Sequence, residues 1–326
     1  MGRYDDTAYA YAVGRIQAVE TGLLDDGKLE QMIAARTFDE AYRMLSEADY
    51  DTALPFEEAL KQALDRTYAL LEELAPDKHL MDIFLLKNDY HNLKVLIKQE
   101  FLPLDAVQDT NCLIANGSMP ADELAALFAN RQFGKLHPVM RQAVEEAISS
   151  MQTAGDPQQI DLLLDRALYR QMAALAGQMD NAFVSGWVAR MADTTNIRTC
   201  VRVRRMGKGA AFLEQALLPC GDLPVSLFLN GCSGPLDAFA QALSATRYAA
   251  VAADGLDIPP GLLEKKCGRF LMEYVMEARY VPLGLEPLVG YLLKKEEEIK
   301  AVRVILVGKK NHLDAAAIRE RVGADG

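Results

Sequence analysis

The chain contains an internal repeat, and this repeat constrains the possible fold more than any other feature of the sequence. Its first element is an apolar stretch that ends at a glycine, followed by one polar or charged residue, then by leucine or methionine, and then by a helical pattern. This loop element occurs at residues 23–30, 113–120 and 217–224. Because glycine stops one helix and permits a new start, each copy predicts a turn between two helices.

The second element of the repeat is Asp-x-x-Asn, followed by an aliphatic and a basic residue. It occurs at residues 89–94 and 193–198, and in altered form at 295–300, where only the aliphatic-basic pair remains. The second Asn follows the first by 104 residues, and another 102 residues lead to Glu298. The two elements alternate three times along the chain. We therefore predict three similar helical units, which comprise residues 1–105, 106–207 and 208–326.

Local patterns along the chain indicate helices rather than strands. Between residues 60 and 74 leucines recur at helical spacing, and charged residues occupy the other faces. Glu40 follows Thr37 by three residues, which is the capping box that begins many helices. No stretch alternates apolar and polar residues between turn signals. Aromatic residues, which favour strands, make up only 7% of the chain. We therefore predict an all-α protein.

The polar residues of the second element are expected to begin the long helices. Asp and Asn side chains accept hydrogen bonds from the free amides of a helix start. The residues interpreted in this way are Asp89, Asn92, Asp193 and Asn196. Ser118 and Asp222, which follow the loop glycines, are expected to do the same for the next helices.

Motifs of common catalytic and cofactor-binding sites are missing from the sequence. There is no G-x-x-x-x-G-K-[ST] loop, no complete G-x-G-x-x-G and no G-x-S-x-G. The four histidines show no H-E-x-x-H pattern. The five cysteines form no C-x-x-C pair and are interpreted as reduced, mostly buried thiols of a cytosolic protein. We therefore predict no cofactor, no metal site and no catalytic residue.

The charge balance and the hydropathy narrow the possible partners. A net charge of −11 argues against a general nucleic-acid binder, since contact with phosphates needs a basic surface. The longest run without a charged residue, 223–236, has 14 residues and includes two prolines. A membrane-spanning helix needs about 20 apolar residues. We therefore predict no nucleic-acid partner and no direct insertion into a bilayer.

Basic residues nevertheless cluster locally. Between Arg190 and Lys208 the sequence has six basic residues and one acid, and three of the arginines are spaced to share one helix face. The first and third copies of the second element carry lysines at related positions. The cluster fits an ordinary basic face, a protein-contact surface or, least well, a nucleic-acid contact. The candidate partner-contact residues are Lys94, Lys98, Arg198, Arg202, Arg205 and Lys300.

The ordered set of motifs resembles a known family, the C subunits of the bacterial and archaeal V/A-type rotary ATPases, which are equivalent to the d subunit of the eukaryotic vacuolar ATPase. The stretches that carry the resemblance are YAYAVGRI at 9–16, the leucine pair at 23–24, LLKNDYHNLK at 85–94, DTTNIRT at 193–199 and GYLLKKEEEIKAVR at 290–303. Each stretch is short and not catalytic. The specific feature is their order along essentially the whole chain.

The resemblance implies three similar helical lobes in a pseudo-threefold arrangement that form a funnel. It also implies a noncatalytic subunit that links the central-stalk shaft to the proteolipid rotor ring. Such a subunit transmits torque between ATP hydrolysis or synthesis and the transport of H⁺ or Na⁺. The expected partners are the central-stalk subunits and the proteolipid ring. The expected location is the cytoplasmic face of the membrane, as a peripheral part of the complex.

Two other functions agree with an all-α repeat protein. One is a repeat scaffold or adaptor without a rotary role, although stacked helix pairs usually repeat every 33 to 47 residues or so. The other is an all-α enzyme whose site is assembled from carboxylates that lie far apart in the sequence. Co-purification from the native membrane would separate these functions from the rotary one.

Overall fold

The structure is a computed structural model that describes residues 6–77, 79–103 and 113–322. Within these ranges the chain consists of helices, turns and irregular segments, and it contains no strand. The predicted all-α fold class is confirmed. In the same described ranges, no helix is both long enough and apolar enough to cross a membrane.

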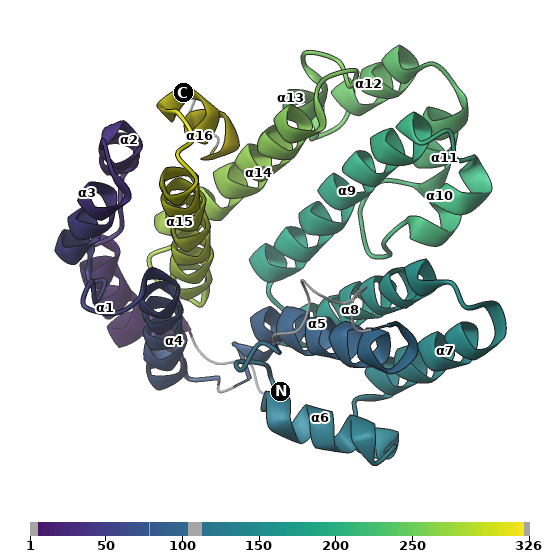
Figure 1. Cartoon of the computed structure of the whole chain (residues 1–326), viewed down its shortest axis with the longest axis horizontal. Helices are drawn as coiled ribbons and strands as arrows, with labels where there is room; N and C mark the ends of the chain where they lie inside the picture. Colours follow the sequence, from purple (N-terminus) through teal and green to yellow (C-terminus); the bar gives the residue numbers. More distant parts are fainter. Residues whose placement is uncertain (1–5, 78, 104–112, 323–326) are drawn as a thin grey trace. The chain divides into compact units, whose positions relative to one another are not determined.

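The described residues form two compact units. The central unit comprises residues 79–271, and the terminal unit combines residues 6–77 with residues 272–322. The helices of the central unit are α5 (Asp82–Phe101), α6 (Ala121–Ala129), η4 (Phe133–Lys135), α7 (Pro138–Ala154), α8 (Pro157–Met179), α9 (Ala182–Arg205), α10 (Ala210–Ala216), α11 (Val225–Ser233), α12 (Leu236–Ser244) and α13 (Ala249–Ala252) (Figure 1). The helices of the terminal unit are η1 (Asp6–Tyr9), α1 (Ala10–Glu20), α2 (Asp26–Ala34), α3 (Phe38–Arg43), η2 (Met44–Ala48), α4 (Phe56–Leu74), η5 (Glu277–Tyr280), α15 (Glu286–Lys310) and α16 (Ala315–Val322). Helix α14 (Pro260–Met276) carries the chain from one unit into the other.

Capping residues define ends of three long helices in the central unit, α7, α8 and α9. Asp156 accepts the amide of Gln158 at 3.0 Å at the start of α8. Asn181 accepts the amide of Val184 at 3.0 Å at the start of α9. Helix α7 ends at Gly155, whose φ of 65° lies in the left-handed region that glycine adopts readily. These ends follow from local sequence alone.

Helix α9 packs its apolar side against the short helices that follow it. Ile197, Cys200 and Val203 belong to one buried cluster with Phe228 of α11 and Tyr248. Figure 1 shows α10 and α11 lying beside α9. Of the charged residues of α9, Arg202 and Arg205 are exposed and Arg198 is half-buried, whereas Asp193 is buried.

The core of the terminal unit joins the two ends of the chain. Met32, Ile33 and Leu45 from the N-terminal part pack in one buried cluster with Val302 and Ile305 of α15. In Figure 1 the purple helices α1 and α3 accordingly lie near the yellow-green helix α15. Because the cluster draws on both ends, neither end can bury its apolar face without the other.

The predicted capping box at the start of α3 is confirmed. Thr37 accepts the amide of Glu40 at 3.1 Å. Glu40 in turn accepts the amide of Arg36 at 2.8 Å, just ahead of the helix. Two amides that the helix itself cannot satisfy are therefore bound by side chains.

The thiols in the described ranges are free, as expected for reduced cysteines. Cys200, Cys232 and Cys267 are buried, whereas Cys220 is exposed, and Cys112 lies outside the described residues. Burial raises the pKa of Cys200 to about 12. This thiol therefore stays protonated and behaves as a small apolar side chain.

Candidate functional site

The Asp-x-x-Asn element lies in the middle of its helix rather than at its start. Asp89 and Asn92 belong to the second and third turns of α5, and Asp193 and Asn196 lie even deeper in α9. The prediction that these four residues begin helices is therefore wrong. Their side chains instead bind the backbone of the loop element. We call each long-helix pair, together with the loop residues that it binds, a loop clasp.

The clasp of α5 holds its loop at two points. Asn92 Oδ1 accepts the amide of Ile114 at 2.8 Å, and its Nδ2 donates to the carbonyl of the same residue at 2.9 Å. Asp89 accepts the amide of Ser118 at 3.1 Å and also the hydroxyl of Ser118. The prediction that Ser118 caps the next helix is therefore wrong, because this residue donates to the long helix instead.

The clasp of α9 repeats this arrangement. Asn196 accepts the amide of Leu218 at 2.7 Å and donates to its carbonyl at 2.9 Å. Asp193 accepts the amide of Asp222 at 2.8 Å and the hydroxyl of Tyr248 at 2.7 Å. Asp222 thus offers its backbone amide rather than a capping carboxylate. The repeat seen in the sequence is a repeat of these contacts.

The loop glycine of each clasp lies directly against the aspartate. A Cβ atom at Gly117 would lie 1.9 Å from Asp89 Oδ1, and one at Gly221 would lie 2.0 Å from Asp193 Oδ1. No side chain fits at either position. Close approach of the backbone to the carboxylate, rather than the end of a helix, is what requires glycine here.

Burial raises the pKa of both clasp aspartates above its ordinary value. The low polarity around Asp89 and Asp193 disfavours their charged forms, and the hydrogen bonds that they accept oppose this effect only in part. Burial, together with the neighbouring Asp193 carboxylate, likewise raises the pKa of Tyr248. Each clasp therefore holds a buried polar group whose partners are all supplied by the fold.

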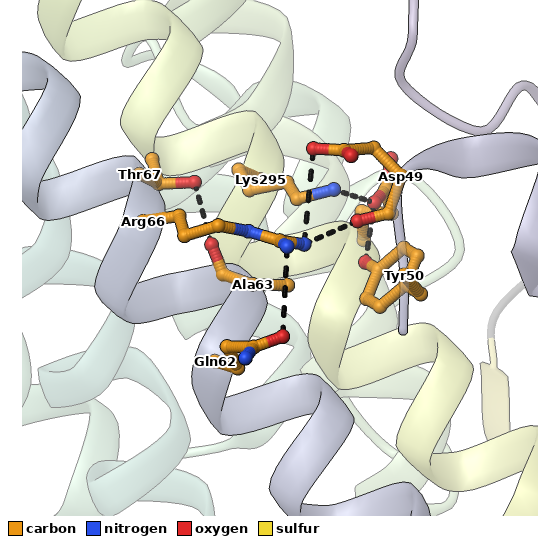
Figure 2. A network of polar contacts seen from close by, with 8 residues as sticks. Asp49, Tyr50, Gln62, Ala63, Arg66, Thr67 and Lys295 are labelled. Carbon is orange, nitrogen blue, oxygen red and sulfur yellow. Dashed lines mark hydrogen bonds and ion pairs between the residues drawn. The ribbon is translucent and has the colours of Figure 1, made fainter. Parts of the chain in front are cut away.

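Helix α15 carries a third clasp made from different residues. Lys295 occupies the Asp position and Glu298 the Asn position. Glu298 accepts the amide of Leu24 at 2.6 Å, the hydroxyl of Tyr50 at 2.5 Å and the ammonium of Lys295 at 2.6 Å. The side chains of Lys295 and Glu298 are only 8% and 4% exposed, so they form a buried ion pair. Figure 2 shows Lys295 beside Tyr50, and the Lys295 Nζ lies 4.3 Å from the centre of the tyrosine ring.

Helix α4 holds the segment that carries Tyr50 in place. Arg66 donates to the carbonyl of Asp49 and its guanidinium also lies 3.7 Å from the carboxylate of that residue (Figure 2). Asp49 has a φ of 62°, in the left-handed region where Asp is one of the tolerated residues. The turn at Asp49 thereby directs Tyr50 toward α15.

A cap within the loop replaces the missing aspartate of the third clasp. Asp25 Oδ1 accepts the amide of Lys28 at 2.8 Å and begins α2. Lys28 directly follows the loop glycine, as Ser118 and Asp222 do in the other two copies. In those copies the amide at this position donates to the aspartate of the long helix. The local cap therefore leaves position 295 free for a lysine.

Alkaline pH is expected to destabilise the protein through its buried tyrosines. Burial raises the pKa of Tyr50, Tyr68, Tyr90 and Tyr248 above the ordinary value of 10.0. Above about pH 10 the unfolded chain releases these protons while the folded chain keeps them, so the folded state binds more protons. The free energy of unfolding should then fall as the pH rises beyond that point.

Denaturant titrations at a series of pH values, followed together with tyrosinate absorbance, measure this effect. The unfolding midpoint should hold steady up to about pH 9 and decline above about pH 10. Full ionisation of these four tyrosines in the still-folded protein near pH 10 would contradict the prediction.

Two of the six predicted contact residues form ion pairs inside the central unit. Lys94 Nζ lies 2.5 Å from Asp165 Oδ1, and Lys98 Nζ lies 2.8 Å from Asp161 Oδ1. The two aspartates are four residues apart on α8, as the lysines are on α5. The lysine side chains are 20% and 22% exposed. These two ion pairs therefore bind α5 to α8.

The three candidate arginines of α9, Arg198, Arg202 and Arg205, lie on its solvent-facing side. Arg198 Nη1 is 3.3 Å from Glu264 Oε1. Arg205 lies 3.6 Å from Asp257 and also donates to the carbonyl of Ile258. Arg202 is exposed, and no carboxylate within the described ranges lies at ion-pairing distance from it. Two of these three arginines thus have a carboxylate nearby that offsets their charge, and Arg202 does not.

The sixth residue, Lys300, belongs to the terminal unit. It is exposed on α15, with its Nζ 3.5 Å from Glu297 on the same helix. The joint role of all six residues in partner contact stays a prediction.

The basic residues of α5 have internal partners that the sequence motifs did not reveal. Asp161 and Asp165 repeat the spacing of Lys94 and Lys98, and this matched spacing was the available signal. Arg204 likewise has an internal partner, because its guanidinium donates to carbonyls at the end of α11, including that of Cys232 at 3.2 Å. The available signal was its helical phase, since Arg204 follows the buried Cys200 by four residues on α9.

Comparison with known proteins identifies the family of the chain. Residues 12–321 match the family model described as ATP synthase (C/AC39) subunit. The chain belongs to this family. The resemblance inferred from the sequence motifs is therefore confirmed.

Relatives of the C/AC39 family match the chain over nearly its whole length. The C subunit of the V-type sodium ATPase of Enterococcus hirae is 24% identical over 318 residues, which cover 94% of this chain and 95% of that protein. The C subunit of the A-type ATP synthase of Methanocaldococcus jannaschii is 24% identical over 349 residues, covering 97% and 86%. That of a Desulfurococcus species is 24% identical over 340 residues, covering 97% and 91%. The similarity thus extends to C subunits of both the V-type and the A-type machines.

Proposed function

We propose that this C/AC39 protein is the noncatalytic coupling subunit of a V/A-type ion-translocating ATPase. In this role it joins the central-stalk shaft to the proteolipid ring on the cytoplasmic face of the membrane. It transmits torque between ATP hydrolysis or synthesis and the transport of H⁺ or Na⁺. It contributes no catalytic residue and binds no cofactor.

The family match over residues 12–321 carries this proposal. The relatives are named as subunits of sodium ATPases or ATP synthases. A part of such a complex that acts by contact must keep its shape under load. Buried networks in which every polar group is hydrogen-bonded make a structure rigid and specify a single conformation.

The order of the clasps supports a cyclic arrangement of the three predicted units. Helix α5 of the first unit, 1–105, holds the loop of the second unit, 106–207. Helix α9 of the second unit holds the loop of the third unit, 208–326. Helix α15 of the third unit holds the loop of the first unit at Leu24. We propose that the three units form a funnel with pseudo-threefold symmetry.

Reconstitution of native membranes tests the coupling role. Membranes depleted of this chain should hydrolyse ATP without pumping ions, because the head and the ring are no longer joined. Adding the purified full-length chain should restore pumping and should recover stalk subunits and proteolipid in a pull-down. Recovery of a soluble partner alone would favour an adaptor, and coupled pumping in fully depleted membranes would contradict the proposal.

Replacing Arg198, Arg202 and Arg205 together by alanine tests the predicted contact surface. The exposed ion pairs lost are worth about 0–1 kcal/mol each, so the chain should still fold. Its affinity for the central stalk at low salt should fall, because complementary charges contribute to binding. Circular dichroism serves as the folding control, and an unchanged affinity would contradict the contact assignment.

A further inference from the structure

The equivalent basic residues of α5 and α9 differ in how completely the chain neutralises them. Lys94 and Arg198 stand two residues after the clasp asparagine in their respective helices. Lys94 is largely enclosed and contacts Asp165 at 2.5 Å. Arg198 is 37% exposed, and its partner Glu264 is 63% exposed at 3.3 Å. Arg198, in the second copy of the repeat, therefore forms a longer and more exposed ion pair than Lys94 does in the first copy.

The guanidinium of Arg198 has hydrogen-bonding capacity to spare. Its contacts with Glu264 Oε1 and Thr195 Oγ1 are both 3.3 Å, beyond the usual optimum for a charged pair. Its Nε–H is buried and has no acceptor among the described residues. If this side chain rotated slightly toward a new carboxylate, it would lose only these two long hydrogen bonds.

Arg202 lies one helical turn beyond Arg198 on the same face of α9. It is exposed, and the described ranges hold no carboxylate within ion-pairing distance. Its place in the last turn lets the helix dipole stabilise its charge without neutralising it. The two arginines thus form one pair of guanidinium groups that the fold leaves incompletely neutralised.

We propose that Arg198 and Arg202 bind two carboxylates, one helical turn apart, on an acidic helix of the central stalk. This inference rests on the proposed coupling function and names the chemistry of its contact. Guanidinium groups match carboxylates in bidentate geometry. The spacing of the two arginines matches glutamates or aspartates three or four residues apart on the partner.

The surroundings of the two arginines favour discrete carboxylates over a polyanion. Glu264 is exposed beside Arg198, and Asp257 is exposed beside Arg205 on the same face of α9. A phosphate backbone or an anionic bilayer is broad enough to meet these acids as well, and the like charges would repel it. A single acidic helix is narrow enough to place its carboxylates on the arginines and avoid Glu264 and Asp257.

The other three candidate contact residues of the central unit have partners within the fold. Lys94 and Lys98 join α5 to α8. Arg205 donates to the carbonyl of Ile258 ahead of α14. The two lysines are therefore suitable controls for the two proposed contact residues.

Binding to the isolated central-stalk subcomplex, measured by calorimetry at low and at high salt, tests the inference. Arg202→Glu breaks no side-chain hydrogen bond or ion pair within the described ranges, and it should weaken binding by about tenfold or more at low salt. Arg198→Gln with Arg202→Gln should weaken binding and also flatten its salt dependence. The matched controls are Arg141→Glu, an exposed charge reversal on α7, and Lys94→Gln with Lys98→Gln. Both should bind within about twofold of the unaltered chain.

The outcomes separate this inference from the proposed function. If the unaltered chain binds the stalk and both arginine variants bind equally well, the inference fails and the coupling function stands. If the unaltered chain does not bind the stalk, the coupling function fails. The inference is then judged with a helical peptide carrying glutamates four residues apart, which must bind the unaltered chain and not Arg202→Glu. Arg202-dependent binding to duplex RNA or to phosphatidylserine vesicles, without binding to the peptide, would overturn the carboxylate assignment.

Discussion

Replacing Glu298 by alanine should lower the free energy of unfolding by about 3–5 kcal/mol. Three donors converge on this carboxylate, namely the ammonium of Lys295, the hydroxyl of Tyr50 and the amide of Leu24. Removing it leaves a buried ammonium without its counter-charge and two further polar groups without acceptors. The effect should be largest in the terminal unit, because this clasp joins its N-terminal and C-terminal parts. Denaturant titration of the full-length chain measures the loss.

A neighbouring substitution and a paired substitution make this test specific. Glu297→Ala removes an exposed carboxylate from the same helix and should cost about 1 kcal/mol or less. Lys295→Asp combined with Glu298→Asn rebuilds the residue pair of the α9 clasp. In that variant Tyr50 can donate to the new aspartate, as Tyr248 does to Asp193. The paired variant should be more stable than Glu298→Ala. A paired variant of lower stability than Glu298→Ala would contradict the equivalence of the clasps.

Replacing Gly221 by alanine should destabilise the protein by about 2–4 kcal/mol. The added methyl group would lie 2.0 Å from Asp193 Oδ1, so the loop must move away from α9. That movement breaks the hydrogen bonds that Asp193 accepts from the amides of Asp222 and Leu223. The carboxylate would then be buried with fewer partners.

Gly209→Ala is the matched control for this loop substitution. It lies in the same unit, its φ is −85°, and nothing lies within 4 Å of the position that an added methyl group would occupy. Its stability should change by less than about 1 kcal/mol. Equal unfolding midpoints for Gly221→Ala and Gly209→Ala would refute the explanation that close approach of the loop to the aspartate requires glycine.

Helix type and position followed from local patterns, and the prediction of an all-α chain held for this reason. Asp156, Asn181 and Thr37 act on amides two or three residues away, so a short stretch of sequence contains all of their interaction. The same local rule misled the interpretation of Asp89 and Asp193. Their partners lie 29 residues further along, in the loops. A capping residue and a clasp residue have the same chemistry and differ only in which amide packing brings to them.

For the candidate contact residues, too, local spacing gave part of the answer and packing gave the rest. Helical spacing was sufficient to place Arg198, Arg202 and Arg205 on one side of α9. It could not show that Asp161 and Asp165 neutralise the lysines of α5, because this depends on how α5 and α8 pack. Spacing alone therefore treated Lys94 and Arg202 alike, although one is internally paired and the other is exposed.

The sequence by itself determined the helical class, the threefold recurrence of two elements and membership of the C/AC39 family, since periodicity and residue order are properties of the chain alone. Only the tertiary structure decided what the recurrence does. It showed that each polar pair binds a loop, that Glu298 joins the two ends of the chain, and that Arg202 has no carboxylate partner in the described ranges. Hydrogen bonds and ion pairs act over a few ångströms, and only folding determines which distant residues come that close.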